Sequence, residues 1–547
     1  MRFGNDAYEK IEMVFHALID GSIFEIQAHT MYTYAPIRVY TYTHIVRVTQ
    51  NPGLAQKRIT TMSHTITGAE PKDTKTFFGH PSMLANLFTV EMWERFSFYG
   101  MQGIMIYYLY YTADKGGLGL DKDLATGVIG AYGAVVYLMA ILGGILGDRI
   151  LGPERTLFYS AIGIMAGHIS LSLIPGIPGV VIGLLLVAIG SGGLKSNASV
   201  LVGSLYSDND SRRDAGFTIF YIGVNTGALI GPILTGWGWQ AGGFHLGFAL
   251  AAIGMAAGLI QYSLTRKNLP ASVHHVGTPF TGAQKRNFFL ALVGIVVVLG
   301  ILLATGLMTA DNLKNWVMGF IFIGAIALFA QLLSAKDVTA DERSRVTAFI
   351  PLWIANAVFW ALYQQQFTVM AVYSDERLNW NILGMELSPN LVNSINPIFI
   401  IVFGMMFSAL WTKWGDRQPV TTLKFSAALI IIGLAFWIFL AQAGVQSVNV
   451  GWIVLILFVC TIAELIISPV GISLATKLAP KAHRVNMMAL YFTSVAMGTV
   501  LSGWLAPFYS METEVPYFTW MGIITIATGI LLFLVHKPVQ KMMRGVK

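Results

Sequence analysis

Long apolar runs dominate this chain and restrict what it can fold into. From residue 79 onward, apolar stretches recur that are long enough to cross a bilayer, for which a helix needs roughly 20 residues. Of the 547 residues, 55% are hydrophobic and 12% are charged, whereas about 25% of the residues in a soluble domain are charged. The sequence therefore predicts an all-α polytopic membrane protein.

The apolar runs can be assigned to individual helices. We predict fourteen membrane helices, at residues 86–111, 125–147, 156–175, 178–204, 215–237, 246–264, 287–307, 313–334, 347–372, 390–412, 421–441, 450–475, 486–508 and 517–536. Most of the 56 glycines fall inside these runs, and missing side chains let helix backbones approach closely in lipid.

The longest polar connection divides the predicted helices. Residues 266–286 contain prolines and histidines and follow the first six helices. We predict a six-helix bundle at 79–265, a linker with two extra helices at 266–346, and a second six-helix bundle with a short basic tail at 347–547.

Residues 1–78 differ from the rest because they contain no long apolar run and no typical signal peptide. We predict a non-membrane extension. The polar stretch that begins at Met62 is typical of an N-terminus, which suggests that residues 1–61 come from upstream translation. A disordered or regulatory extension is the alternative.

The basic residues indicate the topology. If the first helix enters from the cytoplasm, the only lysines and arginines on outside connections are Lys115, Lys122, Lys314 and Arg377. Because cytoplasmic loops carry an excess of these residues, we predict that both termini are cytoplasmic in the cell membrane. The net charge of +7 is thus explained by the basic cytoplasmic loops and does not by itself indicate a nucleic-acid partner.

A few ionisable side chains interrupt the apolar helices. Glu91, Glu94 and Arg95 lie in the first helix, Lys195 in the fourth and Glu464 in a late one. An ionised group near mid-membrane costs at least about 2.5 kcal/mol, so such groups normally face a cavity and have partners. A self-neutralising pair of Glu91 and Arg95 is the local alternative, but it leaves Lys195 and Glu464 unexplained.

The surroundings of these groups lead to further expectations. Lys195 follows three glycines in AIGSGGLKSNASV, which permit tight helix contact, and we expect Glu91 or Glu94 to be its partner. Glu464 lies on a helix that we expect Pro469 and Gly471 to interrupt. The single cysteine, Cys460, excludes an intrachain disulfide and a metal site made of cysteines, and we predict no metal and no cofactor.

Four motifs occur in the order of a known family. EMWERFSFYG at 91–100 resembles the first-helix signature ExxERFxYYG of the proton-dependent oligopeptide transporters, which belong to the major facilitator superfamily. GGILGDRILGPERT at 143–156 resembles the loop between helices two and three of that superfamily, FTIFYIGVNTG at 217–227 the fifth-helix pattern, and ELIISPVGISLATKLAP at 464–480 the tenth-helix signature. The resemblance implies a major facilitator fold of two six-helix bundles, with two inserted helices accounting for fourteen.

The resemblance also implies a function and a set of site residues. Family members import di- and tripeptides with protons, so peptides and protons are the expected partners, and we expect the chain to be a monomer in the bilayer. The amino end of a peptide would be held by Glu464, Asn225 and Asn396. The carboxyl end would be held by Arg95, Lys195, Tyr99 and Tyr137. The side-chain pocket would be lined by Trp360, Tyr491 and Phe98.

Proton coupling would use Glu91, Glu94, Arg95 and Lys195, because protonating an acid would release its cation for the peptide carboxylate. The conformational loop would use Asp148, Arg149 and Arg155.

The sequence departs from the family pattern at three positions. Phe98 stands where tyrosine is usual, and Gln102 and Gln364 replace an arginine and a helix-seven carboxylate of many bacterial relatives. We expect the two glutamines to hydrogen-bond to each other across the mouth of the cavity.

Three other functions remain open. The same fold could move amino acids, peptide-like drugs or other anions, and a receptor could bind peptides without moving them. A membrane enzyme is disfavoured, because the chain contains no HExxH, GxSxG or Walker motif.

Overall fold

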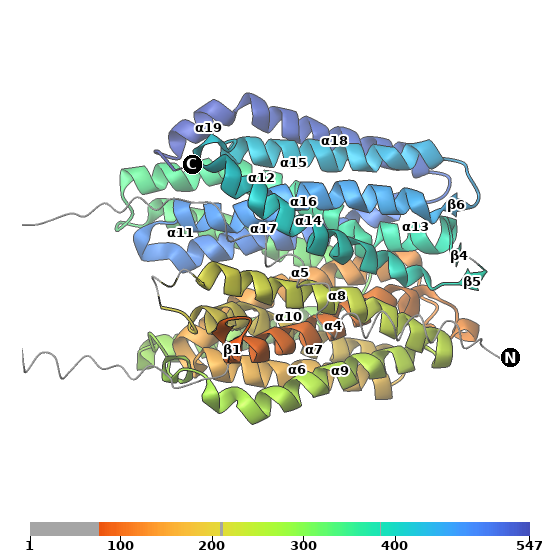
Figure 1. Ribbon diagram of the computed structural model, residues 1–547, viewed down its shortest axis with the longest axis horizontal. Coiled ribbons are helices and arrows are strands. Elements are labelled where there is room, and N and C mark those ends of the chain that lie inside the picture. Colours follow the sequence, from red (N-terminus) through yellow and green to blue (C-terminus); the bar gives the residue numbers. More distant parts are fainter. Residues whose placement is uncertain (1–75, 208–209, 211, 383, 547) are drawn as a thin grey trace, which may run out of the picture. The chain divides into compact units, whose positions relative to one another are not determined.

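The computed structural model describes residues 76–207, 210, 212–382 and 384–546. The predictions for residues 1–61, including the start at Met62, lie outside these residues. The described chain is almost entirely helical (Figure 1).

Six long helices form a first group, which is coloured red to green in the lower half of Figure 1. They are α4 (Met83–Tyr110), α5 (Lys122–Leu146), α6 (Pro153–Leu173), α7 (Gly176–Gly203), α8 (Arg213–Gly242) and α9 (Phe244–Thr265). Each packs against others of the group, most extensively α4 on α8 and α6 on α7. Small residues allow this approach, since a Cβ added at Gly231 would lie 3.0 Å from the backbone nitrogen of Gly100.

A second group packs among its own members in the same way. It consists of α12 (Ala340–Tyr363), α13 (Val369–Arg377), α14 (Val392–Trp414), α15 (Thr421–Ile438), α16 (Val450–Leu478), α17 (Arg484–Leu505), α18 (Glu514–Leu534) and α19 (His536–Met542). The two groups meet where α5 packs on α17 and α8 packs on α14.

Two further helices, α10 (Gly282–Ala304) and α11 (Leu313–Ser334), follow the first group. No residue of α10 is buried in the described chain, whereas α11 packs against α17 and α5. An apolar helix with no buried face suits contact with lipid. The domain limits that we predicted around these two helices stay a prediction.

The remaining elements are short. The strands are β1 (Thr76–Phe77), β2 (His80–Pro81), β3 (Leu378–Asn379), β4 (Asn381–Ile382), β5 (Met385–Glu386) and β6 (Val448–Asn449). They form three two-stranded pairs, β1 with β2 and β4 with β5 antiparallel, β3 with β6 parallel. The one-turn helices include η2 (Gly147–Leu151), η3 (Arg266–Asn268), η4 (Ala271–His274) and η5 (Gln364–Phe367).

The predicted membrane helices are present. By length and composition, 13 described helices are apolar enough to cross a membrane. The fourteenth long helix is α4, with 28 residues. It is not among the 13, because Glu91, Glu94 and Arg95 make it less apolar. The helix predicted at 313–334 has the bounds of α11, and most other boundaries differ by a few residues.

Two predicted helices differ from the structure. The helix predicted at 347–372 starts earlier, because Thr339 and Glu342 form a capping box, and it breaks at η5. There the backbone N–H of Thr368 bonds to the carbonyl oxygen of Gln365 at 3.1 Å, and the side chain of Gln365 accepts a hydrogen bond of 3.0 Å from Tyr517. The interruption expected at Pro469 was wrong, since α16 continues through that residue. A proline removes only one backbone donor, which a membrane helix tolerates.

Candidate functional site

A cavity of about 360 Å³ lies between the two groups of helices. Nearly all the predicted substrate and proton-coupling residues line it, namely Glu91, Arg95, Tyr99, Tyr137, Lys195, Asn225, Trp360, Asn396, Glu464 and Tyr491. Phe98, Gln102 and Gln364 line it as well. Residues as far apart in the sequence as Glu91 and Tyr491 thus face one space. One wall is supplied by α4, α5, α7 and α8, and the other by α12, α14, α16 and α17.

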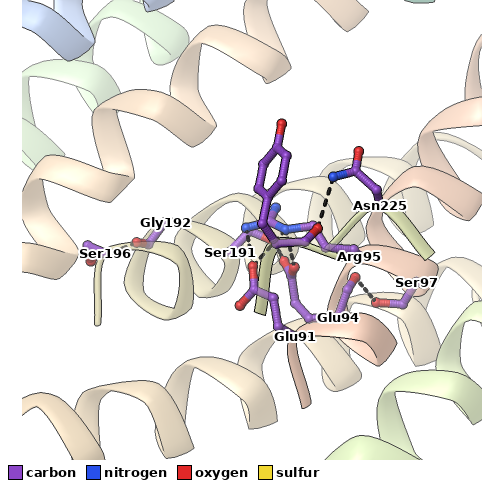
Figure 2. Close-up of polar contacts among 9 residues, drawn as sticks. Glu91, Glu94, Arg95, Ser97, Ser191, Gly192, Ser196 and Asn225 are labelled. Atoms are coloured by element: carbon purple, nitrogen blue, oxygen red, sulfur yellow. Dashed lines mark hydrogen bonds and ion pairs between the residues drawn. The ribbon is translucent and has the colours of Figure 1, made fainter. Parts of the chain in front are cut away.

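Arg95 holds both acids of α4. Its Nε lies 2.9 Å from Glu91 Oε1 and 3.2 Å from Glu94 Oε2, and Nη2 lies 2.8 Å from Glu91 Oε1. Figure 2 shows the two carboxylates directed at the guanidinium group. Glu91 is 3% exposed and Glu94 is fully buried, so neither charge is solvated and Arg95 neutralises the pair only in part. The local pairing of Glu91 with Arg95 is therefore formed, and Glu94 joins it.

Ser191 ties this cluster to a second helix. Ser191 lies on α7, and its hydroxyl donates a hydrogen bond of 2.9 Å to Glu94 Oε1 (Figure 2). Sequence reasoning did not single out this residue. Its position four residues before Lys195 was the available signal, because residues i and i+4 share one face of a helix.

Lys195 does not form the carboxylate pair that we expected. No described acid lies within ion-pair distance of it, and its Nζ lies 4.3 Å from the ring centroid of Tyr137 instead. The physical reason is that Arg95 already occupies both carboxylates, while an aromatic face can also stabilise an ammonium group. Lys195 thus faces the cavity as a cation held by a ring. The glycines before it do pack closely, since a Cβ at Gly190 would lie 2.6 Å from the carbonyl oxygen of Ser160.

Glu464 occupies the opposite wall, on α16. Its Oε2 accepts hydrogen bonds from the hydroxyl of Tyr363 and, at 3.3 Å, from Nδ2 of Asn396. Asn396 also donates to Thr461 at 2.8 Å. No ion pair to Glu464 is formed by any described residue, so the carboxylate relies on neutral donors. Tyr363 was missed from the sequence, where it had no feature beyond its place beside Gln364.

The remaining predicted residues are placed as follows. Nδ2 of Asn225 donates to the backbone oxygen of Tyr221 at 2.9 Å, within its own helix (Figure 2). The ring of Tyr99 stacks on Phe367, with 6.2 Å between centroids. Both side chains therefore reach the cavity with polar atoms still available to a ligand.

The two glutamines are not bonded to each other. Gln364 Nε2 donates to the hydroxyl of Tyr137 at 3.4 Å, and Gln102 has no recorded hydrogen bond among the described residues. They line the same cavity, but Gln364 donates to Tyr137 and the expected bond between the two glutamines across the mouth is absent.

A separate set of contacts joins the two groups near α13. Asp375 accepts hydrogen bonds from the hydroxyls of Tyr110 at 2.6 Å and Tyr111 at 2.5 Å, and Glu376 forms an ion pair with Lys122. These contacts were not predicted, and they link α13 to the ends of α4 and α5.

The predicted conformational loop lies between α5 and α6. Arg149 donates to the backbone oxygen of Thr278 at 3.3 Å and lies over the ring of Phe280, and the backbone oxygen of Asp148 accepts from Thr278. Arg155 is exposed. The polar connection after α9 therefore folds back onto this loop.

Glu154 is the buried acid of that loop, and the sequence did not single it out. It is 1% exposed, its Oε1 lies 2.6 Å from Nε of Arg266, and its Oε2 lies 3.4 Å from Nδ1 of His274. Glu154 thus joins the start of α6 to the connection that leaves α9.

Removing this acid should destabilise the fold. We expect Glu154→Ala to lower the free energy of unfolding by about 1–3 kcal/mol, because breaking a buried pair leaves a charge without its partner. The loss stays moderate because the side chain of Arg266 is 25% exposed. Thermal unfolding in detergent measures it. Arg544→Ala breaks an exposed pair with Asp341 and should have little effect; equal losses would contradict the prediction.

The described residues contain no group of three or more histidine, cysteine, aspartate or glutamate side chains that could hold a metal ion.

Comparisons with known proteins all identify similarity to peptide transporters. A model of the POT family matches residues 154–521. The di-/tripeptide transporter of Lactococcus lactis subsp. cremoris is 40% identical over 493 residues, which cover 87% of this chain and 99% of that protein.

Solved structures give the same result. A peptide transporter POT in complex with sulfate is 41% identical, with a TM-score of 0.82 and coverage of 86% of this chain and 97% of that one. A POT family transporter in complex with 5-aminolevulinic acid is 38% identical, with a TM-score of 0.80 and coverage of 85% and 98%. The chain is similar to these proteins over nearly their full length.

Proposed function

The chain belongs to the POT family, and from this premise we propose that it is a symporter that imports di- and tripeptides together with protons by alternating access. Membership confirms the resemblance drawn from the four motifs and the all-α transporter fold. The chain is accordingly a multi-pass membrane protein and a peptide transporter in the broad sense.

The observation that carries the proposal is the separation of charge in one cavity. Glu464 lies on the wall formed by the second helix group, and Lys195 and Arg95 lie on the wall formed by the first. Every short peptide with free ends carries an ammonium group and a carboxylate. A cavity with an acid that has no ion pair among the described residues on one wall, and with Lys195 and Arg95 on the other, suits both ends whatever the side chains are.

The amino end of the peptide is assigned to Glu464 with Asn225 and Asn396. Asn396 already bonds to Glu464, and this contact supports the assignment because it orients the carboxylate. The ammonium group would replace the missing cation partner of this buried acid.

The carboxyl end is assigned to Lys195 and Arg95, with Tyr99 and Tyr137 as hydroxyl donors. Lys195 is available because no described acid pairs with it, whereas Arg95 must first loosen its hold on Glu91 and Glu94. Trp360, Tyr491 and Phe98 form the apolar part of the wall, where side chains of many kinds could pack.

Proton coupling is assigned to the acids that hold Arg95. A proton on Glu91 or Glu94 would weaken an ion pair and release the guanidinium group for the peptide carboxylate. The bond from Ser191 to Glu94 supports a role in conformational change, because the same proton would alter a contact between α4 and α7. This proposal differs from the expectation drawn from the sequence, in which Glu91 or Glu94 also paired with Lys195.

The wider arrangement follows the same proposal. We assign the conformational loop to Asp148, Arg149 and Arg155, and place both termini in the cytoplasm of a cell whose plasma membrane holds the protein. The proton is the coupling ion, no cofactor is required, and a single chain is the functional unit.

A second cargo class has one supporting observation. The relative of 38% identity was solved in complex with 5-aminolevulinic acid, which carries an amino group and an acid group as a peptide does. Amino acids of this shape could therefore use the same two ends of the cavity.

Uptake into liposomes tests the function. We expect the purified protein to accumulate labelled dialanine when the proton gradient is directed inward, and only to exchange it when there is no gradient. Unlabelled tripeptide and 5-aminolevulinic acid should be added as competitors, and the stronger one identifies the preferred cargo class.

Each other result supports a different function. Binding without exchange would indicate a receptor, hydrolysis of the peptide would indicate an enzyme, and accumulation that ignores the gradient would remove the proton from the mechanism.

A further inference from the structure

The hydrogen bonds of Glu464 are distributed unevenly over its two oxygens. Tyr363 and Asn396 both donate to Oε2. No described residue has a recorded hydrogen bond to Oε1. A buried carboxylate that is supported on one oxygen keeps the other free for a ligand in the cavity that Glu464 lines.

The ring of Tyr363 is held by packing against other aromatic rings in addition to the hydrogen bond of its hydroxyl. It is the last residue of α12, and its ring stacks on Phe359 with centroids 5.8 Å apart and an interplanar angle of 17°. The edge of Trp360 packs against it at 5.2 Å. Only 7% of the residue is exposed, and it lines the cavity. The ring is therefore fixed before any ligand arrives.

The chemistry of a phenol gives this hydroxyl a second role. It has one hydrogen to donate and two lone pairs that can accept. The hydrogen is used on Glu464, so the oxygen still accepts. Next to the free Oε1 of Glu464, it offers a second acceptor for the three N–H groups of an ammonium ion.

We propose that Tyr363 is a specificity residue of the amino-end site: it orients Glu464 by donating to it and accepts one N–H of the substrate's ammonium group. The inference rests on the proposed function, in which Glu464 binds the amino end. It assigns to Tyr363 a preference for amines that carry at least two N–H groups, because one is taken by Glu464 and the next by Tyr363.

The test compares Tyr363→Phe with the wild type in counterflow of labelled dipeptide in liposomes. Phenylalanine keeps the stack on Phe359 and removes only the hydroxyl. We expect the inhibition constant of unlabelled dialanine to rise about tenfold, the usual effect of losing one hydrogen bond to a charged group, with the maximal rate unchanged. A constant that stays the same or falls would overturn the proposal.

A second inhibitor separates this role from a loss of packing. N,N-dimethyl-dialanine carries one N–H on its ammonium group, which Glu464 takes, so Tyr363→Phe removes only the orienting bond to Glu464. The inhibition constant of this analogue should therefore rise by a clearly smaller factor than that of dialanine. An equal loss for both inhibitors would overturn the acceptor role. Where the analogue inhibits too weakly to measure, the constant for dialanine alone decides.

Tyr509→Phe is the matched control. It removes another buried tyrosine hydroxyl of the second helix group that has no hydrogen-bond partner among the described residues, and it should leave both constants unchanged. If the wild type fails to exchange dipeptides, the proposed function fails. If the wild type exchanges them and Tyr363→Phe behaves like it, only this inference fails.

Discussion

Glu464→Gln is expected to weaken dialanine binding by about a hundredfold or more in counterflow. The variant keeps the shape of the side chain and an acceptor for Tyr363, so the packing of α16 should survive. The substitution removes the negative charge that would form an ion pair with the ammonium group of the peptide. Hydrogen bonds to charged groups contribute about 1.5–3 kcal/mol, and the Coulomb attraction in a cavity adds to this. Each 1.4 kcal/mol corresponds to a factor of ten.

The choice of substrates makes this prediction specific. The wild type should discriminate strongly against N-acetyl-dialanine, which has no ammonium group, and Glu464→Gln should lose most of that discrimination. Glu386→Gln neutralises an exposed acid outside the cavity and serves as the control. Wild-type affinity in Glu464→Gln would show that the amino end is held elsewhere.

Composition and the positions of the long apolar runs were sufficient to predict most of the helices. A membrane requires long apolar helices, so the position of α11 could be predicted to the residue. The break at η5 could not, because residues 364–367 contain neither proline nor glycine and the local sequence does not mark the end of α12. The effect of Pro469 was overestimated for a similar reason: sequence alone does not show which neighbours support a helix that contains a proline.

The site could be predicted as a set of residues but not as a set of pairs. Rare charges in apolar helices indicated the cavity, since burial of Glu91, Lys195 or Glu464 needs a polar environment. Which acid meets which cation depends on side-chain geometry, and Arg95 reaches both acids of its own helix before Lys195 does. Tyr363 and Ser191 were missed because a single hydroxyl in an apolar helix has no distinctive pattern.

Lys195→Gln is expected to abolish the accumulation of dialanine that an inward proton gradient drives. Among the described residues that line the cavity, Lys195 and Arg95 are the only lysine or arginine side chains. Without Lys195, a peptide carboxylate must compete with Glu91 and Glu94 for Arg95, which both acids already hold. A proton on Glu91 or Glu94 could still release Arg95, but no carboxylate would be held by Lys195 beside it, so protonation would no longer be linked to peptide binding and the gradient would not drive accumulation.

A second lysine of the chain provides the control for this experiment. Lys424 is also buried and lies over an aromatic ring, with its Nζ 4.2 Å from the centroid of Trp411, but it does not line the cavity. Lys424→Gln should therefore reduce uptake little, which separates loss of the site from loss of a buried cation. Lys195→Arg, which keeps the charge, should retain part of the uptake. Undiminished gradient-driven accumulation in Lys195→Gln would contradict the role of Lys195 in binding the carboxylate and would show that Arg95 alone is sufficient.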